Sequence, residues 1–363
     1  MKHILYVLPY MNLGGTEKQA FSLMDNLQQQ YHISLLAPDG LGAKPFREAG
    51  FFYAEFPRLE QNFLMGVRQF RRSLLAIYRQ KSIDVIHVHG AHELILLVKL
   101  FLPRVPVIFT VHGYHGRQSP VGYRLAAVFC NLFANQVITV SQSELQLLAT
   151  HHLKVKKTTL IYNGVVENKL DVDRITQLTE QFATQITIGT AARLSEAKGL
   201  RYLILAVAQL IDQYPEIRLI IAGEGELEAE LRQLVVDLKV VEHVVFAGYV
   251  ADLHNLLSLM QIFVLPSIQE PFGLVCAEAM SLGKPIIGTN VGGIPEQVVH
   301  GVTGFIVPPG DPTALADSID LLLSNPPLLA ACGQKGYERY QEKFALTGML
   351  RDTVDIYEKV LLE

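Results

Sequence analysis

The stretch Pro266–Pro285, with the sequence PSIQEPFGLVCAEAMSLGKP, decides how this chain is organised. The four apolar residues before it, 262–265, are typical of a short buried strand. A polar, proline-containing loop follows, and from Gly273 onward the spacing of apolar residues predicts a packed helix. Two carboxylates mark the segment, Glu270 on the loop and Glu278 about one and a half turns inside the helix.

The start of that helix, at Gly273, Leu274 and Val275, is suited to a phosphate group. Its N–H groups lack helical partners and lie at the positive end of the helix dipole. Gly273 also has no side chain that would keep an anion away from the backbone. The two carboxylates repel a phosphate but accept hydrogen bonds from hydroxyl groups further along the same ligand. The segment therefore predicts a sugar nucleotide, although the pair taken alone favours a plainer interpretation, two solvated surface glutamates.

The segment resembles the E-x7-E signature of the family-4 retaining glycosyltransferases, which have the GT-B architecture. The resemblance runs through 270–273 and Glu278, continues through GGIPE at 292–296 and GVTGF at 301–305, and with the motifs below covers most of the chain. It implies two Rossmann-like domains that face each other across a cleft. It also implies donor contacts at Phe272, Gly273, Leu274, Val275 and Glu278. The signature is not specific for a substrate.

Strand-like and helix-like segments alternate along the whole chain, which is typical of two parallel, doubly wound α/β sheets. The polar segment 167–184 separates two such series. We therefore predict an N-terminal, acceptor-binding domain over residues 1–165 and a C-terminal, nucleotide-sugar-binding domain over 166–345. The last segment, 346–363, has the spacing of an amphipathic helix, which in the resembled fold crosses back onto the first domain. The expected strands are 4–8, 33–37, 51–54, 85–88, 107–111, 137–140, 159–162, 186–189, 219–222, 244–247, 262–265, 286–288 and 305–307.

In the first half, two motifs follow strands. Gly14 and Gly15 come between the first strand and a helix, where adjacent glycines let the backbone surround an anion, although a plain tight turn fits equally well. The resemblance places them against the donor diphosphate. His112 ends a strand beside a glycine, where it is expected to face the crevice, and the resemblance puts it near the sugar and the acceptor hydroxyl. His87 and His89 end the preceding strand and are candidates to line the acceptor pocket. A buried histidine satisfied by its neighbours is the alternative for each.

In the second half, Arg193 and Lys198 follow a strand in an R-x4-K pattern that the family shares. Two cations on one turn can neutralise a leaving nucleoside diphosphate, a task that other enzymes give to Mg²⁺. The resemblance places the nucleobase near Gly223 and Val250, where simple turn residues are an equally good interpretation. We expect no metal cofactor. The D-x-D sequence at 171–173 lies in the polar segment between domains and is interpreted as a surface charge run.

Composition excludes several classes of protein. The chain has 363 residues and a formal net charge of −4, so it has no overall basic field for nucleic acid. Its three cysteines lack disulfide or metal spacing, which is typical of core residues in a reducing compartment. The apolar runs fall far short of the ~20 residues that span a bilayer, and the apolar start is interpreted as a strand. These features predict a cytoplasmic protein.

The segment 62–81 predicts an amphipathic helix with a basic face formed by Arg68, Arg71, Arg72, Arg79 and Lys81. Such a helix can rest on anionic lipid when the acceptor is a membrane glycolipid, which would make the protein peripheral at the inner face of the cell membrane. A helix packed on the core with a solvated basic face is the alternative, and the pattern alone favours it.

Together these features predict a retaining, metal-independent glycosyltransferase, a hexosyl- or N-acetylhexosaminyl-transferase. It would move a sugar from a nucleotide sugar, UDP in preference to GDP, to a hydroxyl on a carbohydrate or glycolipid, including a lipopolysaccharide or exopolysaccharide precursor. Arg193, Lys198, Glu270 and His112 are the candidate catalytic residues. Two alternatives remain open. One is a nucleotide-sugar epimerase on the same fold, and the other is a protein that binds sugar nucleotides without catalysis.

Overall fold

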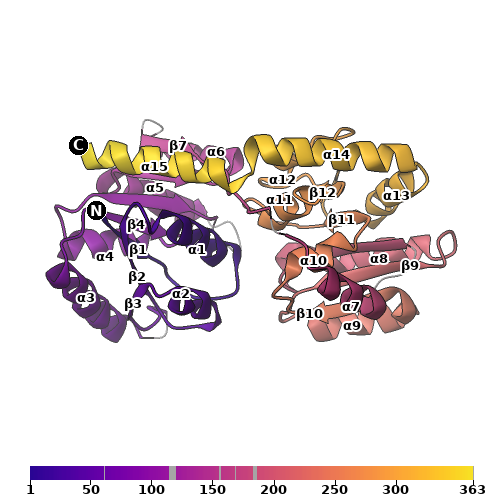
Figure 1. Ribbon diagram of the computed structural model, residues 1–363, viewed down its shortest axis with the longest axis horizontal. Coiled ribbons are helices and arrows are strands. Elements are labelled where there is room, and N and C mark those ends of the chain that lie inside the picture. Colours follow the sequence, from indigo (N-terminus) through magenta and orange to yellow (C-terminus); the bar gives the residue numbers. More distant parts are fainter. Residues whose placement is uncertain (61, 114–119, 155–156, 168, 183–185, 363) are drawn as a thin grey trace. The chain divides into compact units, whose positions relative to one another are not determined.

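The computed structural model of the protein describes residues 1–60, 62–113, 120–154, 157–167, 169–182 and 186–362 (Figure 1). The chain divides into two compact units, each with its own sheet and its own core. Unit 1 consists of Met1–Gly164 and Leu346–Glu363, and unit 2 consists of Val165–Ala345.

Unit 1 is a parallel sheet in the order β3-β2-β1-β4-β5-β6-β7. Helices connect most successive strands, as the alternating sequence pattern predicts. The strands are β1 (His3–Val7), β2 (His32–Ala37), β3 (Phe52–Glu55), β4 (Val85–His89), β5 (Val107–Val111), β6 (Gln136–Thr139) and β7 (Thr158–Leu160). The helices are α1 (Gly15–Leu27), α2 (Lys44–Glu48), α3 (Phe63–Gln80), α4 (Glu93–Phe101), α5 (Pro120–Phe133), α6 (Gln142–Thr150) and α15 (Leu346–Leu362), with a 3-10 turn η1 (Leu41–Ala43).

The helices of unit 1 cover both faces of this sheet (Figure 1). One core lies under α3, α4, α5 and α6, and the other lies under α1, α2 and α15. The last helix, α15, is separated in sequence from the rest of its unit by the whole of unit 2. Its Tyr357 is fully buried against β1 and β4, where its hydroxyl lies 2.6 Å from the Tyr6 hydroxyl and 2.7 Å from Nδ1 of His87.

Unit 2 is a second parallel sheet in the order β10-β9-β8-β11-β12-β13. Its strands are β8 (Ile186–Ala191), β9 (Ile217–Ala222), β10 (Val244–Gly248), β11 (Ile262–Leu265), β12 (Ile286–Thr289) and β13 (Gly304–Val307). Its helices are α7 (Val172–Phe182), α8 (Leu200–Leu210), α9 (Glu228–Asp237), α10 (Leu253–Ser258), α11 (Leu274–Met280), α12 (Ile294–Gln297), α13 (Pro312–Leu323) and α14 (Pro326–Lys343). Two 3-10 turns, η3 (Glu196–Lys198) and η4 (Val241–His243), complete it.

Both sheets are doubly wound, which confirms the predicted α/β fold. In unit 1 the chain leaves β1 toward β2 but leaves β4 toward β5, and β1 and β4 are neighbours. In unit 2 it leaves β8 toward β9 but leaves β11 toward β12, and β8 and β11 are neighbours. Each sheet therefore has a switch point, and the loops beyond the carboxyl ends of the two strands there are where open α/β sheets bind ligands.

Helix α3 differs from the prediction for segment 62–81. Phe70 and Leu74 are buried as the amphipathic pattern predicts, and Ile77 is buried too, but Phe63 and Leu64 in the first turn are 63% and 82% exposed. The predicted apolar face is therefore packed on the core only along its middle and C-terminal part. Among the described residues, no helix combines the length and the apolarity needed to cross a bilayer.

Candidate active site

The loops that follow β8 and β11 meet at the switch point of unit 2. The β8 loop contains Arg193 and, at the end of η3, Lys198, and the β11 loop contains Glu270. Two backbone hydrogen bonds join the loops, because the N–H groups of Ile268 and Gln269 both donate to the carbonyl of Ala197, at 2.8 and 3.0 Å. This junction brings Lys198 next to Glu270 although they are 72 positions apart in the chain.

Lys198 and Glu270 form an ion pair with 2.6 Å between Nζ and Oε2. The side chains are 19% and 9% exposed, so the pair is largely shielded from water. Ser267 also donates to Oε2, at 3.4 Å. Within the described part of the chain Oε1 of Glu270 accepts no hydrogen bond, and the ammonium group has three N–H donors of which Glu270 engages one. The pair can thus hold its own geometry while it binds a ligand.

Glycine at two positions makes this close approach possible. Gly199 has a φ of +60°, and a Cβ there would overlap the carbonyl oxygen of Pro266 in the β11 loop. Gly292, in the loop after β12, has a φ of +51°, and a Cβ there would overlap the carbonyl oxygen of Glu270. The next residue, Gly293, donates its N–H to that same carbonyl at 3.2 Å. The GGIPE motif therefore holds the backbone of Glu270 in place from the far side of the loop.

The start of α11 is held by a buried glutamine. Gly273 is the N-cap of α11, with a φ of +91° that favours glycine. Gln297, at the end of α12, is fully buried and its side-chain amide donates to the carbonyls of Phe272 and Gly273. Arg339 of α14 in turn donates to the backbone carbonyl of Gln297 at 2.8 Å. This chain of contacts fixes the N-terminus of α11 relative to the rest of unit 2.

The remaining predicted residues of this segment take different positions. Phe272 is buried and its ring lies 5.9 Å from that of Phe344. Its side chain therefore packs in the core, and only its backbone lies at the site. Leu274, Val275 and Glu278 are half-buried on α11. Arg193 is exposed on its loop and does not pair with Glu270. The structure thus brings Lys198, Glu270 and the start of α11 together and leaves Arg193 at the surface of the same loop.

Gly223 and Val250 follow the next two strands of unit 2. Gly223 has a φ of +124°, and a Cβ there would overlap the carbonyl oxygen of Ala192 at the start of the β8 loop. Its N–H donates to the carbonyl of Gly248 at 2.7 Å. Val250 is half-buried beside Tyr249, a residue that the sequence interpretation did not single out and whose side chain is 50% exposed. The packing of the strand ends alone accounts for Gly223, and Tyr249 supplies an exposed aromatic ring at this edge.

In unit 1, Gly14 and Gly15 lie at the start of α1, beyond β1. A Cβ at Gly15 would meet no described atom within 4 Å, so packing does not require glycine there and the space is open to a ligand. The backbone of this loop is fixed by Glu17, which is buried in the first turn and accepts a hydrogen bond from the N–H of Asn12 at 2.5 Å. Glu17 was not predicted from the sequence. A glutamate in a first helical turn is common, and only the fold shows it directed back to the loop.

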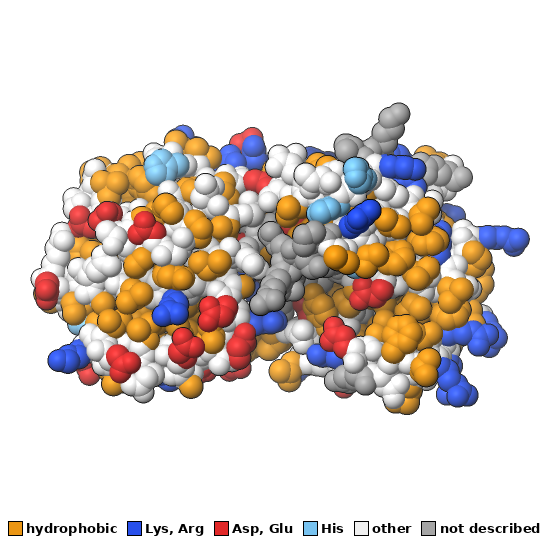
Figure 2. Space-filling model, turned by 180° about the vertical axis from the view of Figure 1, so that it is seen from behind, with side chains coloured by type: hydrophobic (Ala, Val, Ile, Leu, Met, Phe, Trp, Pro, Cys, Tyr) orange, Lys and Arg blue, Asp and Glu red, His pale blue; other side chains and the backbone are white. Residues whose placement is uncertain are grey.

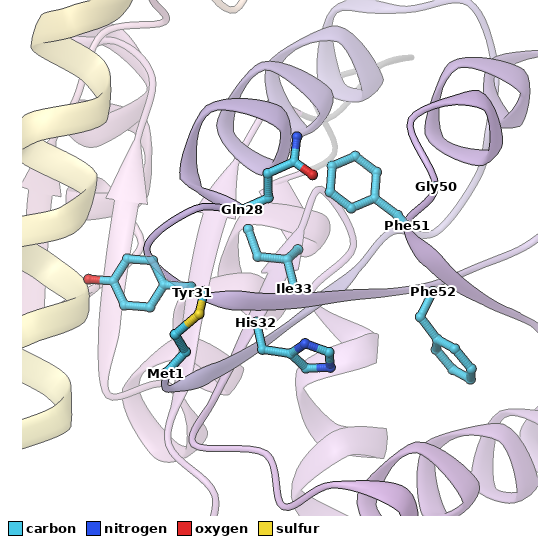
Figure 3. A pocket seen from close by; sticks show the side chains of 8 residues that line it. All are labelled: Met1, Gln28, Tyr31, His32, Ile33, Gly50, Phe51 and Phe52. Carbon is cyan, nitrogen blue, oxygen red and sulfur yellow. The ribbon is translucent and has the colours of Figure 1, made fainter.

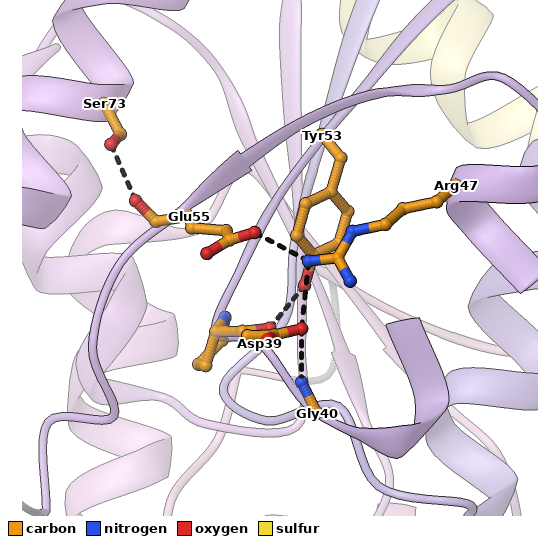
Figure 4. A network of polar contacts seen from close by, with 7 residues as sticks. Asp39, Gly40, Arg47, Tyr53, Glu55 and Ser73 are labelled. Carbon is orange, nitrogen blue, oxygen red and sulfur yellow. Dashed lines mark hydrogen bonds and ion pairs between the residues drawn. The ribbon is translucent and has the colours of Figure 1, made fainter. Parts of the chain in front are cut away.

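A second loop, residues 38–43, contacts the first, and Figure 4 shows the polar contacts of its Asp39 with Gly40 and Arg47. Gly42 donates its N–H to the carbonyl of Met11 at 3.0 Å, and a Cβ at Gly42 would overlap the carbonyl oxygen of Asn12. The position of this second loop is set by Arg47, whose guanidinium donates to Asp39 at 2.9 Å and to Glu55 at 2.6 Å. The hydrogen bond from the N–H of Gly40, followed by that from the Arg47 guanidinium, lowers the pKa of the Asp39 carboxyl.

His112 follows β5 and is 7% exposed, and its place beside the sugar and the acceptor hydroxyl stays a prediction. Its Nε2 lies 2.9 Å from Nδ1 of His89, so the two rings share one hydrogen bond. His89 and His87 are fully buried, which contradicts the prediction that they line an acceptor pocket. His87 is held by Tyr357 and by Thr110, each at 2.7 Å. Burial lowers the pKa of His89 well below its usual range and that of His87 to about 3, so both rings are neutral near pH 7.

Two other places were tested as alternative sites. Asp171 of the D-x-D sequence caps α7, accepting from the N–H of Arg174 at 3.1 Å, and no group of three His, Cys, Asp or Glu among the described residues is arranged to hold a metal ion. A shallow pocket in unit 1 is lined by residues that include Met1 and His32 (Figure 3). These two residues lie at the amino ends of β1 and β2, opposite the strand ends that bind ligands in this kind of sheet.

Comparison with known proteins decides the family. Residues 171–339 match the family described as Glycosyl transferases group 1, and residues 13–169 match Glycosyltransferase Family 4. An uncharacterized glycosyltransferase of Methanocaldococcus jannaschii is 31% identical over 307 residues, which cover 80% of this chain and 78% of the relative. The chain belongs to this family of glycosyltransferases. Another relative of this glycosyltransferase, 27% identical over 78% of this chain and 77% of its own, is the N-acetyl-alpha-D-glucosaminyl L-malate synthase of Bacillus anthracis.

Solved structures support the fold of the glycosyltransferase. Anabaena HepE, crystallised in complex with UDP and glucose, superposes with a TM-score of 0.88 over 99% of this chain and 100% of its own, at 24% identity. The sucrose-phosphate synthase of Thermosynechococcus elongatus superposes with a TM-score of 0.84 over the whole of both chains, at 21% identity. Both likenesses concern the fold, and the GT-B architecture of the chain is thereby confirmed.

Proposed function

We propose that this glycosyltransferase transfers a sugar from a UDP-sugar to a hydroxyl group of a carbohydrate or glycolipid, with retention of anomeric configuration and without a metal ion. The observation that carries the proposal is the Lys198–Glu270 pair at the switch point of unit 2, next to the start of α11. The complex of the structurally similar HepE with UDP and glucose supports a UDP-linked donor.

Each residue of unit 2 has a role that its geometry permits. Lys198 keeps two N–H donors for the diphosphate, on which negative charge grows as the sugar bond breaks. Arg193, exposed on the same loop, supplies a second cation. Glu270 directs Oε1 at hydroxyls of the sugar, and the backbone N–H groups at Gly273 and Leu274 bind phosphate oxygens. Glu278, further along α11, binds the ribose.

Unit 1 supplies the acceptor side in this proposal. Gly15 leaves open space at the start of α1, where the diphosphate can approach the backbone. His112, which shares a hydrogen bond with His89, is assigned to the neighbourhood of the sugar and the acceptor hydroxyl in this proposal. In a retaining reaction of this kind the departing phosphate oxygen takes the proton of the acceptor hydroxyl, so no side-chain nucleophile is required.

The two glutamates give the sharpest test. Glu270→Gln should lower kcat strongly and leave the affinity for UDP nearly intact, because Glu270 positions the reacting sugar carbon. Glu278→Gln should instead weaken UDP binding by about 1–3 kcal/mol, the usual cost of spoiling a hydrogen bond to a charged group. Calorimetric titration of UDP and GDP into both variants, combined with steady-state kinetics, measures these effects. Glu242→Gln, before β10 at the opposite end of the sheet, is the matched control and should change neither.

The outcome also separates the proposal from its alternatives. Incubation with a nucleotide sugar alone should leave the sugar unchanged, and an acceptor should be needed for turnover. A changed sugar without acceptor would establish an epimerase. UDP-sugar binding without turnover on any of a broad set of acceptors would leave a binding protein. If Glu270→Gln loses UDP affinity and Glu278→Gln does not, the donor lies in the opposite direction along α11.

A further inference from the structure

Helix α5 of unit 1 carries apolar side chains on both of its faces. The inner face, with Tyr123, Ala126, Ala127 and Cys130, is buried in the core. The outer face presents Val121, Leu125, Val128 and Leu132, which are spaced at intervals of three and four residues and are therefore aligned in one stripe. A surface helix of a globular protein normally places polar residues on its outer face, so this stripe is not explained by the core.

Helix α4 extends the stripe. It packs against α5 on one side and α3 on the other, and its Leu96 and Leu100, one turn apart, are also exposed. We call the six residues Leu96, Leu100, Val121, Leu125, Val128 and Leu132 the α4–α5 apolar surface. Their side chains are between 38% and 67% exposed. Single exposed leucines are ordinary, but six large apolar side chains exposed on two helices that pack together are typical of an interaction surface.

The charged residues on α3, α4 and α5 are mostly basic. The sequences of α3, α4 and α5 together contain six Lys and Arg residues and a single acid, Glu93, although the whole chain has a net charge of −4. Within the described part of the chain, Arg68, Arg72 and Arg124 form no ion pair and are exposed. In the rear view, hydrophobic side chains gather on the unit 1 half, on the right, with Lys and Arg along its outer edge (Figure 2).

We propose that the α4–α5 apolar surface docks unit 1 on an anionic lipid bilayer. Leucine and valine side chains on a helix face enter the boundary between headgroups and acyl chains, and arginines beside them meet the lipid phosphates. A second copy of this chain is disfavoured as the occupant, because it would bring two sets of unpaired arginines together. The proposal extends the lipid contact suggested for α3 by supplying apolar anchors on two further helices. It does not depend on the donor assignment.

Vesicle flotation with the full-length protein tests the proposal. The protein should float with vesicles of phosphatidylcholine containing about one third phosphatidylglycerol and stay unbound with pure phosphatidylcholine. Leu125→Ser and Leu132→Ser should each lower the partition coefficient about tenfold, because each removes a large apolar group from the interface. Arg68→Gln and Arg124→Gln should each lower it about fivefold at low salt.

Two controls match these variants. Leu41→Ser removes an exposed leucine of unit 1 outside α3, α4 and α5, and Arg351→Gln removes an exposed arginine on α15; neither should change flotation. Circular dichroism and the thermal shift produced by UDP confirm that every variant is folded, and a normal UDP response with lost flotation separates this proposal from that for the donor site.

Three results would overturn the proposal. One is equal flotation with neutral and anionic vesicles. Another is unchanged flotation of the Leu125→Ser and Leu132→Ser double variant. The third is self-association in sedimentation equilibrium that the same double variant abolishes, without any vesicle binding, which would assign the surface to a second copy of the chain.

Discussion

At the scale of single residues, the Lys198–Glu270 pair should contribute to stability as well as to the proposed reaction. Lys198→Met leaves the Glu270 carboxylate, whose side chain is 9% exposed, without its cation and should lower the free energy of unfolding by about 3 kcal/mol. The Lys198→Met, Glu270→Gln double variant removes both charges and should recover most of that loss while remaining inactive. Urea unfolding followed by circular dichroism measures the cycle. Lys335→Met breaks an exposed pair with Glu338, which water screens, and should leave the free energy of unfolding nearly unchanged.

The sequence identified these two residues but not their pairing. R-x4-K and E-x7-E are local patterns, whereas the ion pair depends on hydrogen bonds from Ile268 and Gln269 to Ala197, which exist only once two distant strands are neighbours. The histidines were predicted less well. His87 and His89 alternate with apolar residues on a strand, and nothing local distinguishes a histidine that faces a crevice from one that Tyr357 of the last helix covers. The roles of the site residues stay predictions.

At the scale of elements, the strands were predictable because parallel strands buried on both faces are short apolar runs bounded by turn residues. All expected strands agree with the structure to within two residues at each end, and the differences of two residues are at the end of β7, the end of β8 and the start of β9. The exposed apolar stripe on the outer face of α5 was not predicted from the sequence. Apolar residues lie on both the buried and the exposed side of α5, so the sequence pattern does not show which of them face solvent, and only the fold shows the exposed stripe.

The contact of α15 with β4 makes the protein sensitive to acid. His87 has a pKa of about 3 in the folded protein and about 6.5 when unfolding exposes it, so the unfolded chain binds more protons between these values. Stability should therefore fall as the pH falls from about 6.5 toward 3, by about 1.4 kcal/mol per pH unit for this residue. His87→Gln should reduce that slope, while His152→Asn, at an exposed position, should leave it unchanged. Urea unfolding at several pH values measures the slopes, and equal slopes for wild type and His87→Gln would contradict the assignment.

At the scale of the whole molecule, the net charge does not show where the basic and acidic residues lie on the surface. A net charge of −4 argues against a basic surface, yet three helices of unit 1 hold six basic residues and one acid. Composition is a sum over the chain, whereas binding depends on which charges the fold places together. The same reasoning applies to the donor site, where Lys198 and Arg193 are two cations on one loop of an acidic protein.

Those two cations lead to a prediction for the intact protein. If they take the place of a metal ion, UDP should raise the melting temperature equally with EDTA and with Mg²⁺, and UDP at 100 times its dissociation constant should add about 2.7 kcal/mol of stability. Lys198→Ala and Arg193→Ala should each reduce the shift, whereas Lys343→Ala, an exposed lysine at the end of α14, should not. Differential scanning fluorimetry measures all four proteins under both conditions. A shift that requires Mg²⁺ and vanishes with EDTA would show that the diphosphate is neutralised by a metal, and Lys198 would then have only the structural role of holding Glu270.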